Sequence, residues 1–410
     1  MYKITIAHGQ QRLSKIMMLI FALSPLLAWY KIAFPVSLGY TLILFLSAYT
    51  IYKNKLLINV LPRCFWFLFF YISIWWIINN DFHIWTLFPP GGWLFFLFVL
   101  AIIGGTLSFN YSLLKKYMRW IVLCSIPLFW IQQILLLSTG SIQISFVPHL
   151  TNEFTYMGFT YGNLVSKQLS DGQACAFFLE KSYMAYYLVT YLALEWFDKN
   201  GKEKWLTKEI VLIILTLAFL RSGSGIVGFS ILFTVKIFSI FWNTNLQRRI
   251  LMIILLIPLL GGTLYVYINT EIGQKLLSRS EEFSTEGSSG YSRVIAGYLL
   301  FDQLNTDEKV IGIPDARERF SLQRADGTEV FYINGIQTIL INLGIIGFVL
   351  YILFYGTLYK NGSFASRMCI IVLLTMSLLE SNYLNPYMML LTFIPCADLR
   401  NRRQLVISNK

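Results

Sequence analysis

Long blocks of apolar residues without a charged side chain recur along this chain. They occupy residues 16–30, 40–52, 65–78, 93–103 and 211–220, and short polar or basic breaks separate them. Of the 410 residues, 56% are hydrophobic and only 13% are charged, about half the charged fraction of an ordinary soluble protein. Backbone groups in lipid must be hydrogen-bonded within their own segment, so these blocks predict transmembrane helices.

We predict an all-α polytopic membrane protein with about 12 transmembrane helices, forming a single integral membrane domain over residues 1–410. The predicted spans are 16–34, 36–52, 64–78, 92–108, 120–138, 173–195, 209–221, 224–242, 250–268, 333–359, 368–380 and 386–397. The first block lacks a small-x-small cleavage motif and is soon followed by Pro35. It is therefore expected to be a retained span rather than a cleaved signal peptide.

The orientation of the spans follows from the net charge of +12, which is unevenly distributed. Basic residues gather in alternate breaks, whereas the break at 79–92 has none and the break at 139–172 has only Lys167. Cytoplasmic loops carry an excess of Lys and Arg, so both termini are predicted to be cytoplasmic. This asymmetry accounts for the basic composition better than a nucleic-acid partner does, and no nucleic-acid partner is expected.

Two outer segments are long enough to carry function. Residues 139–172 form the first long loop and are rich in Gly, Ser, Thr and aromatic residues. Residues 269–332 form the large loop, which is strongly charged. Helical spacing of its apolar residues predicts amphipathic helices that lie along the membrane surface. The residues with this spacing are Tyr291, Val294, Ile295, Tyr298 and Phe301.

Glu180 is the first candidate for a catalytic role, because ionisable residues inside membrane spans are functional candidates by default. It is predicted to lie about seven residues, or roughly 10 Å, inside the outer end of the sixth span. Two interpretations remain open. Glu180 is either a carboxylate facing an outward-open cavity or part of a structural ion pair between two helices.

Arg221 is the second candidate, because it precedes a turn of small residues, Ser222-Gly223-Ser224-Gly225. Ser224 is predicted to cap the following span, so that a positive helix N-terminus lies beside the guanidinium. This combination favours an anion, and a phosphate above all. The alternative is an arginine that reaches from the span to the lipid–water interface.

Arg293 is predicted as a second phosphate ligand. Ser292 and Arg293 are expected in the first turn of a helix, where a cation is unfavourable unless an anion neutralises it. The alternative is pairing of Arg293 with acidic residues that precede it in the large loop. Arg317 and Arg319 alternate with acidic residues, a pattern typical of a solvated face.

Several motifs of soluble phosphate chemistry are absent from the sequence. It contains no D-x-D motif, no G-x-x-x-x-G-K-[ST] loop and no metal-ligand cluster. The predicted inner loops are also too short for a nucleotide-binding domain. A phosphate compound is therefore expected to arrive from the outer face or from the lipid, with no cofactor.

Taken with these residues, the chain resembles the Wzy-type O-antigen and polysaccharide repeat-unit polymerases, which are related to the O-antigen ligases. The resemblance covers almost the whole chain as a topology and rests on five short motifs. These are Leu179-Glu180-Lys181-Ser182-Tyr183-Met184-Ala185, Leu220-Arg221-Ser222-Gly223-Ser224, Gly290-Tyr291-Ser292-Arg293, Ile311-Gly312-Ile313-Pro314, and the span with Asn334, Gly344 and Gly347. Lys181 stands where the family usually has proline. Tyr332 and Ile333 stand near the position of a ligase histidine, which favours a polymerase over a ligase.

The resemblance implies a metal-independent glycosyltransferase of the bacterial inner membrane. Such an enzyme joins undecaprenyl-pyrophosphate-linked oligosaccharide repeat units at the periplasmic face, with membrane lipid and a chain-length-regulating membrane protein as further partners. It implies that Arg221 and Arg293 hold the pyrophosphate, and that Glu180 acts as the base or orients an arginine. The substrate-binding residues that it implies are Ser222, Ser292, Tyr183, Tyr332, Asn334, Arg317 and Arg319.

Three other functions are alternatives to the polymerase. An O-antigen ligase shares the phosphate site, so the sequence separates it poorly. A flippase for the same lipid-linked units would need a central cationic cavity and repeat symmetry, and the sequence shows no internal repeat. A non-catalytic scaffold would not explain an arginine next to a bare glycine turn. A flippase also has no need for a large ordered outer loop, so the loop at residues 269–332 favours the enzyme over a flippase.

Overall fold

The computed structural model describes two compact units. The described residues are 8–27, 30–33, 36–53, 61–78, 97–99, 110–150, 153–154, 160–197, 207–243, 291–313, 322–323, 329–330, 333–379 and 391–399. The first unit comprises residues 1–228, 349–373 and 384–410, and the second comprises 229–348 and 374–383. The predicted ninth span, 250–268, and nearly all of the fourth lie outside the described residues.

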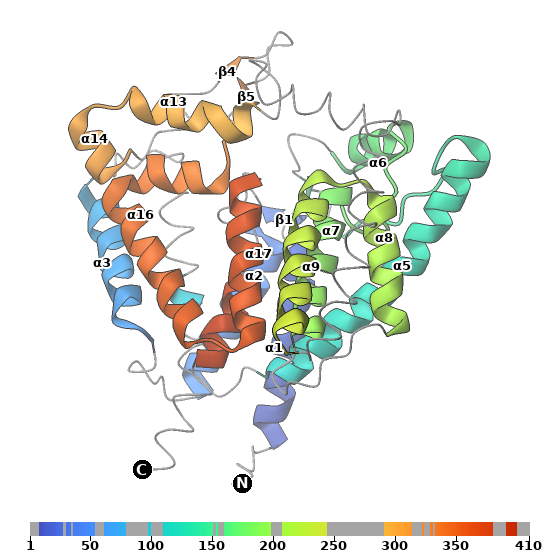
Figure 1. Cartoon of the computed structure of the whole chain (residues 1–410), viewed down its shortest axis with the longest axis horizontal. Helices are drawn as coiled ribbons and strands as arrows, with labels where there is room; N and C mark the ends of the chain where they lie inside the picture. The colour runs from blue at the N-terminus through green and yellow to red at the C-terminus, as the bar shows by residue number, and fades with distance from the viewer. Residues whose placement is uncertain are drawn as a thin grey trace. The chain divides into compact units, whose positions relative to one another are not determined.

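Helices make up most of the described chain (Figure 1). Those of the first unit are α1 (His8–Leu27), α2 (Leu38–Lys53), α3 (Arg63–Ile78), α5 (Tyr111–Thr139), α6 (Tyr161–Ser170), α7 (Lys181–Trp196) and α8 (Lys208–Leu220). Those of the second are the π-helix η2 (Ser292–Ala296), α13 (Gly297–Asp302) and α14 (Thr306–Ile311). The helices α9 (Gly223–Asn243), α16 (Gly335–Asn361) and α17 (Phe364–Leu379) contribute residues to both units.

Two described helices, α5 and α16, are long and apolar enough to cross a membrane. Five shorter apolar helical stretches occur at residues 13–27, 38–52, 63–78, 223–239 and 364–379. Each overlaps one of the predicted spans, which is the pattern expected of apolar blocks that satisfy their own backbone hydrogen bonds. The prediction of a helical fold is therefore confirmed, while the full set of twelve spans remains a prediction.

Short strands are a feature that the sequence did not predict. β1 (Tyr30–Ala33) pairs antiparallel with β2 (Val36–Ser37) and with β3 (Glu153–Phe154). A second antiparallel pair joins β4 (Leu322–Gln323) to β5 (Glu329–Val330) in the large loop. The Tyr30 hydroxyl also donates to the Pro148 carbonyl. The β1–β3 pairing and the hydrogen bond from Tyr30 to Pro148 attach the loop at 139–172 to the segment that follows α1.

Side-chain caps determine where several helices begin. The Asn110 side chain accepts a hydrogen bond from the Leu113 N–H at the start of α5, and the Thr207 hydroxyl accepts one from the Ile210 N–H at the start of α8. Such caps satisfy backbone donors that have no partner inside the helix. Helix α5 ends at Gly140, whose φ of 77° lies in the left-handed region that favours glycine.

The sixth predicted span differs from the structure at its outer end. Residues 173–180 are not helical, and α7 begins at Lys181. Glu180 is therefore the N-cap residue of α7 and does not lie two turns inside a span, as the sequence predicted. The physical cause is a set of long-range hydrogen bonds to this segment, described below.

Within the second unit, η2 and α13 pack against the beginning of α16 (Figure 1). Gly297 is buried there, and a Cβ at this position would lie 2.7 Å or less from atoms of the Gln337 side chain. Leu300 and Phe301 pack on a small core formed by Leu304, Ile313, Ile333 and Ile341. The predicted helix is therefore present, although Val294 and Tyr298 of its predicted apolar face are exposed.

Candidate functional site

The N-termini of α7 and α9 meet within the first unit. Gly225, in the first turn of α9, lies so close to α7 that a Cβ at this position would be 2.5 Å from the Cβ of Ala185. Since α8 runs from the end of α7 back to the start of α9, both N-termini lie at the same end of this helix group. Orphan N–H groups and aligned peptide dipoles make such an end favourable for anions.

Arg221 occupies the turn that joins α8 to α9. It is the C-cap residue of α8 and has a left-handed backbone, with φ 51° and ψ 37°. Its side chain is exposed, and within the described part of the chain no hydrogen bond or ion pair holds it. The guanidinium is therefore available to a ligand beside the first turn of α9.

Ser222 is the residue that caps α9. Its hydroxyl lies 3.4 Å from the Gly225 N–H and 3.3 Å from the Ser224 hydroxyl, and its carbonyl accepts the Ile226 N–H. Ser222 is only 4% exposed. The sequence had assigned the cap to Ser224, which is wrong by two residues. The cause is that α9 begins at Gly223, so the preceding serine takes the N-cap position.

Glu180 keeps its carboxylate available although it occupies an N-cap position. Its side chain makes no capping hydrogen bond to α7, and Oε2 accepts from the Ser182 hydroxyl at 3.0 Å. The carboxylate is half-buried at the positive end of the helix, where a negative charge is stabilised. It therefore stands as a carboxylate with free acceptor positions at the end of the unit where Arg221 lies. Tyr183, in the first turn of the same helix, is buried.

Gln132, a fully buried residue of α5, holds the segment that leads to Glu180. Its Oε1 accepts hydrogen bonds from the N–H groups of Cys175 and Ala176, at 3.0 and 2.8 Å. Ala176 has a φ of 55°, and this bond supports the strained turn there. The Gln132 Nε2 donates to the Ile144 carbonyl at 2.9 Å. One amide side chain thus connects α5, the first long loop and the turn before α7.

Gln168, on α6, supports the same segment from the other side. Its Nε2 donates to the Leu179 carbonyl at 2.6 Å, and its Oε1 accepts from the Ser145 hydroxyl at 2.9 Å. Neither glutamine was among the residues that the sequence analysis singled out. A buried amide must also be hydrogen-bonded, so Gln132 inside an uncharged block was a signal that could have been used.

Asn334 has a structural role at the start of α16 in the second unit. Its Oδ1 accepts from the Gln337 N–H at 2.8 Å, while the Asn334 N–H donates to Gln337 Oε1 at 3.1 Å. This reciprocal pair is a capping box. Gln337 Nε2 also donates to the Val294 carbonyl at 2.8 Å, and so fastens η2 to α16. The predicted contact of Asn334 with sugar remains a prediction.

Gly312 and Gly344, which both lie in motifs of the family resemblance, contact each other. A Cβ on Gly312 would be 2.5 Å from the Gly344 nitrogen, and Ile313 donates from its N–H to the Ile341 carbonyl at 3.0 Å. Gly344 interrupts α16 with φ 64° and ψ −174°, a conformation that only glycine adopts readily. The two glycines allow the end of α14 to dock on a break in a long apolar helix.

The remaining predicted residues are only partly described. The backbones of Ser292 and Arg293 form η2, but their side chains lie outside the described residues, as do Tyr332, Arg317 and Arg319. Arg221 belongs to the first unit and Arg293 to the second. The structure thus brings together the ends of the helices that carry Glu180, Tyr183, Arg221 and Ser222. Their convergence with Arg293 remains a prediction.

Two further observations concern charged residues. Lys236, within the apolar helix α9, is only 3% exposed and was not among the residues that the sequence analysis singled out. Buried lysines in apolar helices are functional candidates by default. Among the residues that the structure describes, no group of three or more His, Cys, Asp or Glu side chains could hold a metal ion.

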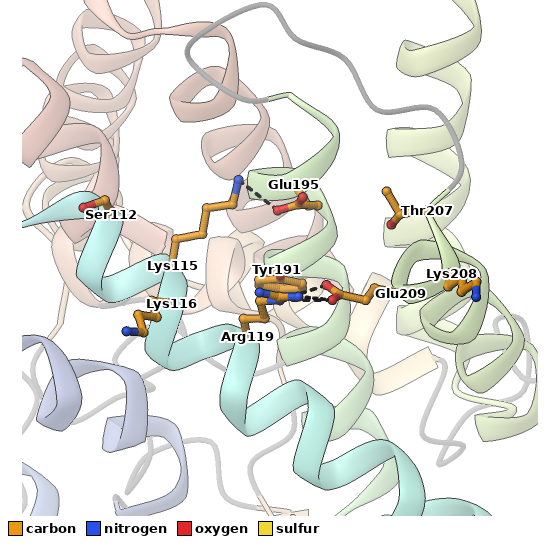
Figure 2. Close-up of a pocket in the computed structure, with 9 residues that line it drawn as sticks. All are labelled: Ser112, Lys115, Lys116, Arg119, Tyr191, Glu195, Thr207, Lys208 and Glu209. Atoms are coloured by element: carbon orange, nitrogen blue, oxygen red, sulfur yellow. Dashed lines mark hydrogen bonds and ion pairs between the residues drawn. The ribbon is translucent and has the colours of Figure 1, made fainter.

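A polar cleft of about 460 Å³ lies at the other end of the first unit (Figure 2). Its lining includes Glu195, which is fifteen residues beyond Glu180 on α7 and hence about 22 Å along the helix axis. The cleft is therefore separate from the α7 and α9 N-termini. Its charged groups come from three helices. The sequence analysis used its basic residues only for the orientation of the chain, and it did not single out the carboxylates Glu195 and Glu209.

The comparisons with known proteins add no family to these observations. No protein-family model matches the sequence, and no curated protein matches it.

Proposed function

We propose that the protein is an O-antigen polymerase that joins undecaprenyl-pyrophosphate-linked oligosaccharide repeat units at the periplasmic face of a bacterial inner membrane. The observation that carries the proposal is the contact of Gly225 with Ala185. It brings the helix end that bears Glu180 beside the helix end that bears Arg221. The two chemical groups needed for transfer from a lipid pyrophosphate thus come from one end of a helix group.

The reaction needs little more than charge and alignment. The acceptor hydroxyl of one repeat unit attacks the anomeric carbon of the glycan on a second lipid. The bond from that carbon to the pyrophosphate oxygen breaks, and undecaprenyl pyrophosphate leaves with the bonding electrons. Glu180 takes the proton of the hydroxyl, and Arg221 with the N–H groups of the first turn of α9 stabilises the departing pyrophosphate. Alignment of two lipids in one site supplies much of the remaining rate enhancement.

The conformation of Arg221 supports this role. A left-handed backbone costs a non-glycine residue about 1 kcal/mol or more, and glycine is the usual occupant of such a helix end. An exposed arginine at this position is explained if its guanidinium donates two parallel hydrogen bonds to two oxygens of a phosphate group. In this proposal Arg293 contributes a second cation from the large loop. Tyr183, Tyr332, Asn334, Arg317 and Arg319 are assigned to the sugar or to the support of its site.

Complementation of a deletion strain tests the proposal. The deletion should reduce the lipopolysaccharide ladder to a single capped repeat unit, and the wild-type gene should restore it. Arg221→Lys should fail to restore long chains, because lysine cannot reproduce the bidentate contact. Glu180→Gln should fail because an amide cannot accept the proton.

Arg63→Lys is the matched control, since Arg63 is an exposed arginine at the first residue of α3. It should restore the ladder fully at an equal amount of protein in the membrane. Long chains in both Arg221→Lys and Arg221→Ala would remove Arg221 from the active site. Loss of all O-antigen in the deletion strain, with lipid-linked polymer accumulating, would identify a ligase instead.

A further inference from the structure

The cleft lined by α5, α7 and α8 contains more positively charged side chains than its ion pairs neutralise. Lys115 Nζ lies 2.9 Å from Glu195 Oε2, and Arg119 Nε lies 3.0 Å from Glu209 Oε2. Lys116 and Lys208 also line the cleft, both are exposed, and Figure 2 shows them on its two sides. Four cations face two carboxylates there, which leaves an excess of two positive charges.

Two helix N-termini border the same cleft. Ser112 belongs to the first turn of α5, and Thr207 and Lys208 are the N-cap and first residue of α8. These helices have 29 and 13 residues, so each has a developed dipole with its positive end at the cleft. The C-terminal end of α7, which reaches the cleft at Glu195, has the opposite polarity, so two positive helix ends and one negative end border the cleft. Their sum favours an anion, as the lysines do.

Tyr191 provides a third, independent observation. This α7 residue lines the cleft and is only 1% exposed, and its hydroxyl has no hydrogen-bond partner in the described part of the chain. A buried hydroxyl without a partner is costly. A ligand oxygen that enters between the Lys115–Glu195 and Arg119–Glu209 pairs would remove this cost by accepting the hydrogen bond.

We infer that this cleft binds the phosphate group of an anionic membrane lipid. The predicted orientation places its basic residues at the cytoplasmic leaflet, where anionic headgroups are concentrated and basic pockets between helices recognise them. Exposed apolar side chains of α5 and α8, among them Leu123 and Val211, continue along the helices from the cleft, so lipid chains can lie against these two helices. The site is separate from the proposed catalytic end and takes part in no step of the transfer reaction.

Native mass spectrometry of the detergent-purified full chain tests this inference, with phosphatidylglycerol and phosphatidylcholine as probes. The wild type should retain phosphatidylglycerol preferentially. Lys116→Gln with Lys208→Gln should weaken that binding about 25-fold, from about fivefold for each lysine near a lipid surface. Tyr191→Phe should weaken it about tenfold, as expected for a lost hydrogen bond to a charged group. Both lysines are exposed, so the double lysine variant should unfold at the wild-type temperature.

Lys360→Gln is the matched control, because it removes the same charge from an exposed residue of the same unit that does not line the cleft. Phosphatidylglycerol binding that is equal in the double variant, the control and the wild type would overturn the inference. Inorganic phosphate serves as a second probe, by competition against the lipid. If it binds the wild type and not the double variant while phosphatidylglycerol binding stays unchanged, the site holds soluble phosphate and the lipid assignment fails.

Discussion

Gly225 is the residue on which the geometry of the candidate site depends most directly. The first turn of α9 approaches α7 so closely that a Cβ on Gly225 would lie 2.5 Å from the Cβ of Ala185. A glycine in a helix otherwise carries a cost of roughly 1 kcal/mol relative to alanine. Glycine is needed here despite this cost, because the close approach of α9 to α7 sets the separation of the helix ends that carry Glu180 and Arg221.

Gly225→Ala should therefore push the two helix ends apart. The new Cβ would lie 2.5 Å from Ala185 Cβ, and overpacking of this kind typically costs about 1–3 kcal/mol. We expect a lower unfolding temperature in detergent and loss of long lipopolysaccharide chains. The double variant Gly225→Ala with Ala185→Gly should recover both, because the second change removes the opposing Cβ.

Gly223→Ala is the matched control for Gly225→Ala. A Cβ at Gly223, in the same first turn of α9, meets no atom within 4 Å. This variant should therefore keep wild-type stability and activity. Equal effects of the two alanine substitutions, or failure of the double variant to recover, would show that the α7–α9 contact does not position the site.

Among the secondary-structure elements, the break in α16 at Gly344 determines how α14 packs on this helix. Gly344 interrupts the helix so that the end of α14 can contact its backbone, and Ile313 uses the freed Ile341 carbonyl. The helix does not end there, because residues on both sides of the break remain helical as far as Asn361. The large loop is thus attached to an apolar helix through backbone groups.

Gly344→Ala should detach the end of α14 from α16. The substitution places a Cβ 2.4 Å from the Val310 carbonyl oxygen and forces alanine into a glycine conformation, at a cost of about 1–3 kcal/mol. Hydrogen exchange should then become faster at the Ile313 amide. Gly356→Ala, in the same helix but with no atom within 4 Å of the added Cβ, should leave this exchange unchanged. Slow exchange at Ile313 in both variants would mean that the glycine contact is not needed for docking.

The elements show which parts of the structure local sequence patterns can predict. Asn110 and Thr207 cap α5 and α8 through residues three positions away, so local chemistry determines both starts. The start of α7 was misplaced because Gln132, more than forty residues earlier, binds the backbone at Cys175 and Ala176. Gly312 and Gly344 were both recognised as motif residues, yet their mutual contact depends on tertiary structure. The small-residue turn at Arg221 was predicted because glycine and serine determine it locally.

At the scale of the whole molecule, the predicted orientation can be tested by cysteine labelling. In a background with all five cysteines replaced by alanine, Ser166→Cys on α6 and Asn361→Cys at the end of α16 each introduce one exposed thiol. A membrane-impermeant maleimide should label Ser166→Cys in spheroplasts and Asn361→Cys only after lysis, because the positive-inside rule places them on opposite faces. Labelling of both from the same side would contradict the orientation.

In the proposed function, the chain itself transfers a glycan from one lipid pyrophosphate to another. The most direct measurement supplies the purified protein in liposomes with an undecaprenyl-pyrophosphate-linked repeat unit and follows glycan length and free undecaprenyl pyrophosphate together. A polymerase should give longer glycans with one lipid pyrophosphate released for every new glycosidic bond, and the Arg221→Lys variant should give neither product. Movement of the intact lipid-linked unit across the bilayer without elongation would contradict the proposed function and identify a flippase.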